Sequence, residues 1–98
     1  MATLLITARA RGDLDELIET RELPPYAAAR YGARIDQLTH FPLSGRQVSG
    51  RTRWLRLLVG PWPWIITVYD YDAATDRVTV LTVQDARMRP ATGSGRRP

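Results

Sequence analysis

Hydrophobic and polar residues follow a helical period in the first half of the chain and a two-residue period in the second half. Residues 3–7, TLLIT, form a short apolar and β-branched run that predicts a first strand, and Thr7 is suited to cap a following helix. Leu14, Leu17 and Ile18 then recur at helical spacing, while the acidic residues of this segment lie mostly off that stripe. The opening segment therefore predicts a strand followed by an amphipathic helix.

A second helix is predicted from about residue 25 to residue 38. The proline pair Pro24-Pro25 ends the first helix and supplies the first turn of the next. Four apolar residues of this segment are spaced 3, 4 and 3 positions apart: Ala28, Tyr31, Ile35 and Leu38. They form a narrow seam suited to an antiparallel helical hairpin. Arg30 and Arg34 lie on a different face, where we expect them to remain free for solvent or a partner.

Three strands are predicted in the second half, after a turn at residues 44–46. Residues 51–59 alternate in side-chain direction and predict the first of them. Residues 64–71 are apolar on both faces, which predicts a central strand with helices over one side of the sheet. Residues 77–84 alternate threonine with apolar side chains and predict the last strand. Hairpin connections are expected at 60–63 and 72–76.

These elements predict an α+β fold in the order βααβββ, with a small, mostly antiparallel sheet packed against an antiparallel helical hairpin. A chain of 98 residues is long enough for one domain, which buries about 60 to 65% of the surface of the unfolded chain. We assign residues 1–89 to this domain. Residues 90–98, PATGSGRRP, have almost no apolar side chain to anchor them and predict a disordered basic tail.

The net charge of +4 is distributed unevenly along the chain. No carboxylate occurs between Asp36 and Asp70, and the same interval contains four arginines: Arg46, Arg51, Arg53 and Arg56. Such asymmetry predicts a cationic face that attracts nucleic acid or an acidic protein.

Composition excludes several classes of function. The chain has no cysteine and one histidine, so we expect neither a disulfide framework nor a zinc site, and no motif indicates another cofactor. No apolar run approaches the roughly 20 residues that span a bilayer, so we expect no membrane segment and a cytoplasmic protein. A metabolic enzyme is not expected, because the chain lacks a phosphate-binding glycine loop and a Ser-His-Asp order.

Together with this order of elements, several short motifs resemble the RelE/ParE superfamily of toxins from bacterial type II toxin–antitoxin systems. The resemblance runs from about residue 8 to residue 89 and includes Phe41-Pro42, Gly45-Arg46 and Val48. The FP-x-x-GR-x-V segment is similar to the ParE-like branch, whose members are associated with poisoning DNA gyrase. The resemblance therefore implies a toxin that inhibits DNA gyrase and arrests growth. It also implies a cognate antitoxin that neutralises the toxin in a hetero-oligomer.

Two alternatives remain open: a RelE-like endoribonuclease that cleaves messenger RNA on the ribosome, and a non-toxic relative that retains only partner binding. For the nuclease, arginines would stabilise the phosphate charge and a tyrosine would relay a proton. The candidates are Arg51, Arg53, Arg56, Arg87 and Tyr69. The chain departs from the RelE-like pattern at the start of the central strand, where Trp64 or its neighbour replaces an arginine, and after the last strand.

The residues expected to bind the target or partner are arginines and one tryptophan: Arg46, Arg51, Arg53, Arg56, Trp62, Arg87 and Arg89. Arg30, Arg34 and Trp54 are expected to bind the antitoxin. An acidic amphipathic segment of the antitoxin would fold along a groove between the helical hairpin and the basic sheet. Trp62 stands between two prolines at a hairpin tip, so we expect it to be exposed, and we expect Trp64 to belong to the core.

Overall fold

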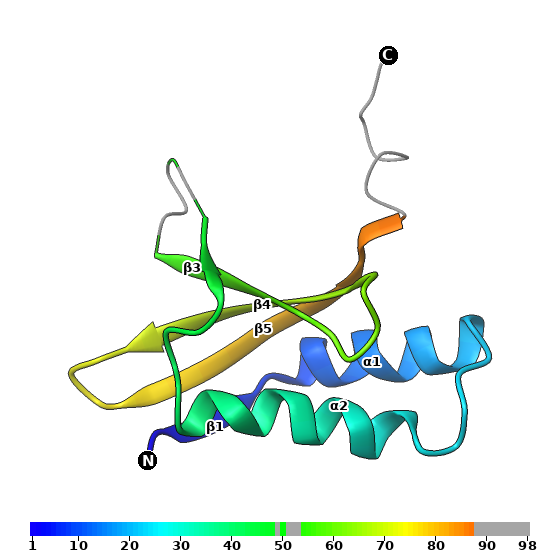
Figure 1. Cartoon of the computed structure of the whole chain (residues 1–98), viewed down its shortest axis with the longest axis horizontal. Coiled ribbons are helices and arrows are strands. Elements are labelled where there is room, and N and C mark those ends of the chain that lie inside the picture. Colours follow the sequence, from blue (N-terminus) through cyan, green and yellow to red (C-terminus); the bar gives the residue numbers. More distant parts are fainter. Residues whose placement is uncertain (49, 51–53, 88–98) are drawn as a thin grey trace.

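The computed structural model describes residues 1–48, 50 and 54–87, and the predicted elements occur in it in the predicted order (Figure 1). The helices are α1 (Ala8–Thr20), α2 (Ala27–Asp36) and the short 3-10 helix η1 (Gln37–Thr39). The strands are β1 (Thr3–Ile6), β2 (Arg46–Gln47), β3 (Leu55–Val59), β4 (Ile65–Asp72) and β5 (Arg77–Asp85). The α+β class and the βααβββ course are confirmed, with β2 as an additional strand.

The five strands form one sheet in the order β1-β5-β4-β3-β2. β1 runs parallel to β5, and every other neighbouring pair is antiparallel. β4 occupies the centre, as its apolar residues on both faces predict, and the helical hairpin lies on one side of the sheet (Figure 1). Among the residues that the structure describes, no helix is long and apolar enough to span a membrane.

Two polar side chains join the start of α1 to β5. The Thr7 hydroxyl accepts a hydrogen bond from the Ala10 amide (3.2 Å), which is the predicted helix cap, and donates to the Val80 carbonyl (2.9 Å). One turn into α1, the Asp13 carboxylate accepts the Val83 amide at 3.2 Å. Because β1 pairs with β5 only as far as Val80, these side chains satisfy the strand edge that β1 leaves uncovered.

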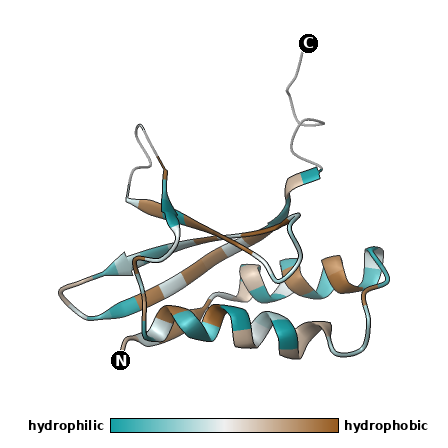
Figure 2. Cartoon of the chain, in the orientation of Figure 1, coloured by the Kyte–Doolittle hydropathy of each residue, from teal (hydrophilic) through white to brown (hydrophobic). Residues whose placement is uncertain are grey.

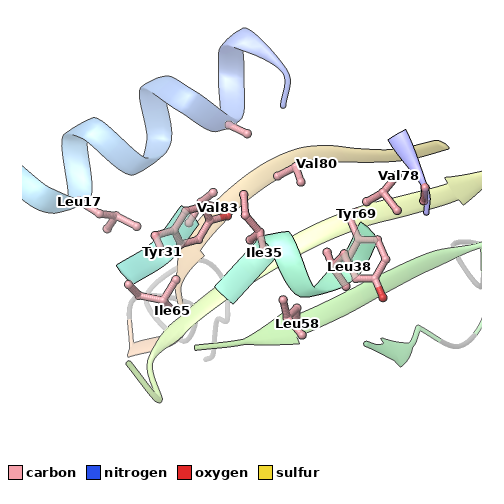
Figure 3. Packing of buried hydrophobic residues seen from close by; sticks show 12 residues of the cluster. Leu17, Tyr31, Ile35, Leu38, Leu58, Ile65, Tyr69, Val78, Val80 and Val83 are labelled. Atoms are coloured by element: carbon pink, nitrogen blue, oxygen red, sulfur yellow. The ribbon is translucent and has the colours of Figure 1, made fainter. Parts of the chain in front are cut away.

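The hydrophobic core lies between the helical hairpin and the sheet (Figure 3). Its largest fully buried apolar side chains come from α2, η1 and the two longest strands: Tyr69, Ile35, Leu38, Ile65, Val78 and Val80. Bands of apolar and polar residues alternate along both helices (Figure 2), as expected for helices that bury one face each.

The apolar seam of α2 differs from the prediction at its first residue. Ala28 is exposed, whereas Ala27 is only 1% exposed and precedes the buried Tyr31 and Ile35. The prediction is wrong at this position because steps of three and of four residues both keep a side chain on the same helix face. The burial of Ala27 therefore depends on how α2 is rotated against the sheet.

The hydrophobic pattern does not indicate the β2 strand. The sequence predicts a turn at residues 44–46, but Arg46 already pairs with Leu57 of β3, and Gln47 pairs with Arg56. A two-residue strand is too short to show an alternating pattern. The predicted strand start at Arg51 and the predicted tail at residues 90–98 lie outside the described residues.

Candidate functional site

A buried tyrosine holds the loop of residues 41–45, which connects η1 to β2. Tyr69 of β4 is 0% exposed, and its hydroxyl donates to the Pro42 carbonyl (2.8 Å) and accepts from the Gly45 amide (2.9 Å). Burial raises the pKa of Tyr69, so the phenol keeps its proton at neutral pH. The single donor hydrogen of this hydroxyl is therefore engaged within the protein.

Arg56 holds the same loop from the neighbouring strand. It lies opposite Tyr69 in the pairing of β3 with β4, and its Nη1 donates to the carbonyls of Gly45 (2.8 Å) and Leu43 (3.2 Å). The sequence predicts that Arg56 binds a target or a phosphate, whereas in the structure its guanidinium contacts the protein's own main chain. Tyr69 and Arg56 together position the 41–45 loop against the sheet.

A cleft of about 320 Å³ lies beside β3, where β2 no longer covers it, and we call it the edge cleft. β2 pairs with β3 only at residues 56 and 57, so in the described part of the chain Val59 has no strand neighbour on that side. Arg34 of α2 lines the edge cleft, and its Nε and Nη2 donate to the Val59 carbonyl at 3.0 and 2.8 Å. Arg46 lines the same cleft and is exposed.

An apolar hollow of about 450 Å³ adjoins the edge cleft, and the two share Ser44. Phe41, Pro42, Leu43 and Tyr71 also line this hollow. Phe41 is 67% exposed and Leu43 is 59% exposed, which is unfavourable in water unless another surface covers them. The sequence analysis did not predict this surface, because it used Phe41 and Pro42 only as evidence for a family resemblance.

Arginine and tryptophan side chains stack around the turn between β3 and β4. The Arg30 guanidinium lies 5.1 Å from the centre of the Trp62 ring, the Trp62 and Trp64 ring centres are 6.5 Å apart, and the Arg87 guanidinium lies 4.0 Å from the Trp64 ring. Trp62 is partly buried against the core, so the prediction of an exposed tryptophan at the hairpin tip is wrong. It packs inward because α2 passes beside the turn and Arg30 covers the ring. Trp64 packs against the core, as predicted.

Asp85 fixes Arg87 at one end of this stack. The Asp85 side chain is 3% exposed, and its carboxylate accepts hydrogen bonds from Arg21 Nε (2.8 Å) and from Arg87 Nε and Nη2 (both 3.2 Å). The hydrogen bonds from Arg87, assisted by Arg21 and opposed by burial, lower the pKa of Asp85 to about 2. Arg87 is thus paired with a permanent anion at neutral pH.

Four arginines follow one another along this margin of the molecule: Arg46, Arg34, Arg30 and Arg87. Arg46 and Arg34 line the edge cleft, and Arg34 and Arg30 are one turn apart on α2. Arg30 and Arg87 lie over neighbouring tryptophan rings. We call these residues the arginine row. It joins residues that the sequence assigned separately to the target and to the antitoxin.

The remaining predicted site residues are placed as follows. Trp54 precedes β3 and is 57% exposed, whereas Arg51, Arg53 and Arg89 lie outside the described residues. Arg30 and Arg34 are expected to remain free for solvent or a partner, but Arg34 donates to the Val59 carbonyl and Arg30 lies over the Trp62 ring. Within residues 1–48, 50 and 54–87, no three histidine or acidic side chains gather as a metal ion would require.

The chain matches a known protein family and is similar in fold to solved structures. The family model described as ParE toxin of type II toxin-antitoxin system, parDE, matches residues 4–90. The fold is similar to that of a chain in the crystal structure of the toxin-antitoxin complex RelBE2 from Mycobacterium tuberculosis, with 22% identity and a TM-score of 0.67. That similarity covers 86% of this chain and 96% of the other.

Two solution structures from Helicobacter pylori share the fold. The conserved hypothetical protein HP0892 is 11% identical with a TM-score of 0.61, and HP0894 is 13% identical with a TM-score of 0.52. In both cases the similarity covers 89% of this chain and 97% of the other. The comparison with curated proteins finds no match.

Proposed function

Because the chain belongs to the ParE toxin family of type II toxin–antitoxin systems, we propose that it inhibits DNA gyrase when free and is neutralised by a cognate antitoxin. The observation that carries this proposal is the arginine row, which lies beside exposed apolar side chains. Among the described residues, those that line the edge cleft include no carboxylate and no histidine. Such a surface suits a protein partner that supplies carboxylates and apolar side chains.

The arginine row contains two residues whose N–H donors remain for a partner. The Arg46 side chain forms no hydrogen bond or ion pair with any residue that the structure describes. The Arg30 guanidinium lies over the Trp62 ring and forms no side-chain hydrogen bond with any described residue, so its N–H donors remain for carboxylate oxygens. In contrast, Arg34 and Arg87 already donate to Val59 and Asp85. We therefore assign carboxylate recognition to Arg46 and Arg30.

An acidic, amphipathic antitoxin segment fits this surface. Its carboxylates would pair with Arg46 and Arg30, and its apolar side chains would cover the exposed Val59 in the edge cleft and Trp54 at the start of β3. A structural relative of this chain was crystallised as a toxin–antitoxin complex, which is consistent with a partner of this kind. Gyrase would bind when the antitoxin leaves the same surface.

Contacts within the protein favour gyrase over the nuclease alternative. Of the residues proposed for phosphate chemistry, Tyr69, Arg56 and Arg87 are described, and each donates hydrogen bonds to a carbonyl or carboxylate of the protein itself. A proton relay needs a hydroxyl within reach of substrate, whereas Tyr69 is completely buried. Inhibition through protein binding requires no proton transfer and no phosphate contact from these three groups.

The test compares two targets with the same purified protein. It is incubated with DNA gyrase and supercoiled plasmid, and in parallel with translating ribosomes and messenger RNA. We expect stalled gyrase cleavage complexes that disappear when antitoxin is added first, and intact message. Cuts in the message at codon positions would contradict the gyrase proposal and favour the nuclease alternative. The absence of both effects would also contradict it and favour a relative that retains only partner binding.

A matched pair of arginine variants tests the assigned surface. Arg46→Ala is expected to weaken antitoxin binding and growth arrest by about five- to tenfold, which corresponds to the loss of a charge-assisted hydrogen bond of roughly 1–1.5 kcal/mol. Arg11→Ala removes an exposed arginine of α1 outside the arginine row and serves as the control for net charge. Equal effects of the two substitutions would exclude Arg46 from the binding surface.

A further inference from the structure

We propose that Tyr69 and Arg56 are positioning residues for the partner surface. They hold residues 41–46 in one conformation and thereby determine where Phe41, Leu43 and Arg46 meet the partner. This inference rests on the proposed function to the extent that Arg46 belongs to the partner surface.

The 41–45 loop is held through its main chain rather than through its own side chains. Phe41 and Leu43 are 67% and 59% exposed, so burial of these apolar groups contributes little to the conformation of the loop. Instead, Tyr69 and Arg56 form four hydrogen bonds to the main chain of Pro42, Leu43 and Gly45, at 2.8 to 3.2 Å. The sheet therefore orders the loop through its main chain, and the apolar side chains of the loop remain exposed for a partner.

Gly45 allows this arrangement because the loop passes very close to the sheet. A Cβ atom at Gly45 would lie 2.6 Å from both the Cε1 and the hydroxyl oxygen of Tyr69 and 2.8 Å from the Leu57 carbonyl oxygen. Such distances are far below van der Waals contact, so no larger residue fits without displacing the loop. Arg46 follows Gly45 directly, so the position of the Gly45 main chain helps to determine where the Arg46 side chain begins.

Ordering a loop before binding increases affinity, because the partner does not have to immobilise it. Each side chain that is ordered on binding lowers the affinity, and a preorganised surface avoids that loss. Phe41 and Leu43 flank the apolar hollow, and Arg46 lies in the edge cleft that shares Ser44 with it. Release of the loop would therefore disturb the apolar and the charged parts of the partner surface together.

Two tyrosine-to-phenylalanine substitutions separate positioning from general stability. Tyr69→Phe removes the hydroxyl that contacts the loop, whereas Tyr31→Phe removes an equally buried hydroxyl, which shares a 2.6 Å hydrogen bond with Thr67 in the core. Both variants are expected to melt at lower temperature, because Tyr31→Phe loses one buried hydrogen bond and Tyr69→Phe loses two. Only Tyr69→Phe is expected to accelerate hydrogen exchange at the Gly45 amide, by at least about tenfold, and to weaken binding of the purified antitoxin by about five- to tenfold.

Arg56→Gln provides a second variant on the other side of the loop, in case Tyr69→Phe unfolds. It shortens the donor that reaches the Gly45 and Leu43 carbonyls and is expected to raise loop exchange and lower antitoxin affinity in the same direction. Equal Gly45 exchange rates in the Tyr69→Phe and Tyr31→Phe proteins would overturn the proposal, and so would equal antitoxin affinities. The gyrase assay on the wild-type protein is independent of this comparison, so failure of the proposed target and failure of the positioning role are distinguishable.

Discussion

The substitution Gly45→Ala tests the close approach of the 41–45 loop to the sheet with a single added methyl group. The new Cβ would lie 2.6 Å from Tyr69 and 2.8 Å from the main-chain carbonyl of Leu57. The Tyr69 ring is fully buried and Leu57 belongs to a paired strand, so neither neighbour is free to move aside. We therefore expect the loop to shift and the hydrogen bond between the Gly45 amide and Tyr69 to break.

The magnitude follows from two contributions. Insertion of a methylene into a packed site destabilises by about 1–3 kcal/mol, and the loss of a buried hydrogen bond adds about 1 kcal/mol. The sum of about 2–4 kcal/mol corresponds to a decrease in Tm of about 10 to 25 °C for a domain of this size. Urea titration followed by tryptophan fluorescence measures the free energy of unfolding, and an unchanged m-value indicates that the unfolded state is the same.

Gly32→Ala is the matched control, because a Cβ at Gly32 in α2 meets no atom within 4 Å. That substitution is expected to stabilise the protein by about 0.5–1 kcal/mol, since alanine has the higher helix propensity. If Gly45→Ala changes the free energy of unfolding by less than about 0.5 kcal/mol, the described contact between the loop and Tyr69 does not exist in solution.

Three further predictions concern other parts of the fold. Because the pKa of Asp85 is lowered to about 2, its ionised form stabilises the folded state above about pH 4, and this stability is lost as the pH falls toward 2. In urea titrations at several pH values, Asp85→Asn should remove about 1–2 kcal/mol of this acid-dependent stability. An unaltered pH dependence in the variant would contradict the prediction. Arg34→Ala should lower the free energy of unfolding by about 1–2 kcal/mol and increase self-association in light scattering, because it leaves the Val59 carbonyl at the edge of β3 without its donor. An unchanged Tm and particle size would argue against this role of Arg34. Removal of residues after Pro90 should leave the Tm unchanged in calorimetry, because the sequence predicts a tail there, and a large decrease would disprove that prediction.

The fold was predictable to the extent that each element has its own local pattern. The cap at Thr7, the alternation of β5 and the apolar run of β4 lie within short stretches of sequence, and each occurs where the pattern indicates. The prediction failed where the pattern is ambiguous or short. Ala27 and Ala28 satisfy the helical period equally well, and β2 has only two residues. Packing against the rest of the molecule decides such cases.

The candidate site was predictable only in part. The sequence predicts that Arg46 binds the target or partner and that Arg30 and Arg34 bind the antitoxin, whereas in the structure Arg46 and Arg34 line the same cleft. It also predicts that Arg56 and an exposed Trp62 bind the target or partner, whereas in the structure Arg56 contacts the 41–45 loop and Trp62 packs under Arg30. An arginine that binds the protein's own carbonyls and an arginine that awaits a partner look the same in a sequence.

The α+β class, the order of helices and strands and the resemblance to the toxin family follow from the amino-acid sequence, because they depend on periodicity and motifs within short segments. Which guanidinium groups already have an acceptor within the protein becomes visible only in the folded chain. Arg56 meets Leu43 across 13 residues of sequence, Arg34 meets Val59 across 25 and Arg21 meets Asp85 across 64. These acceptors lie far from their donors along the chain, so the competition between internal and external partners is settled only when the helices pack on the sheet.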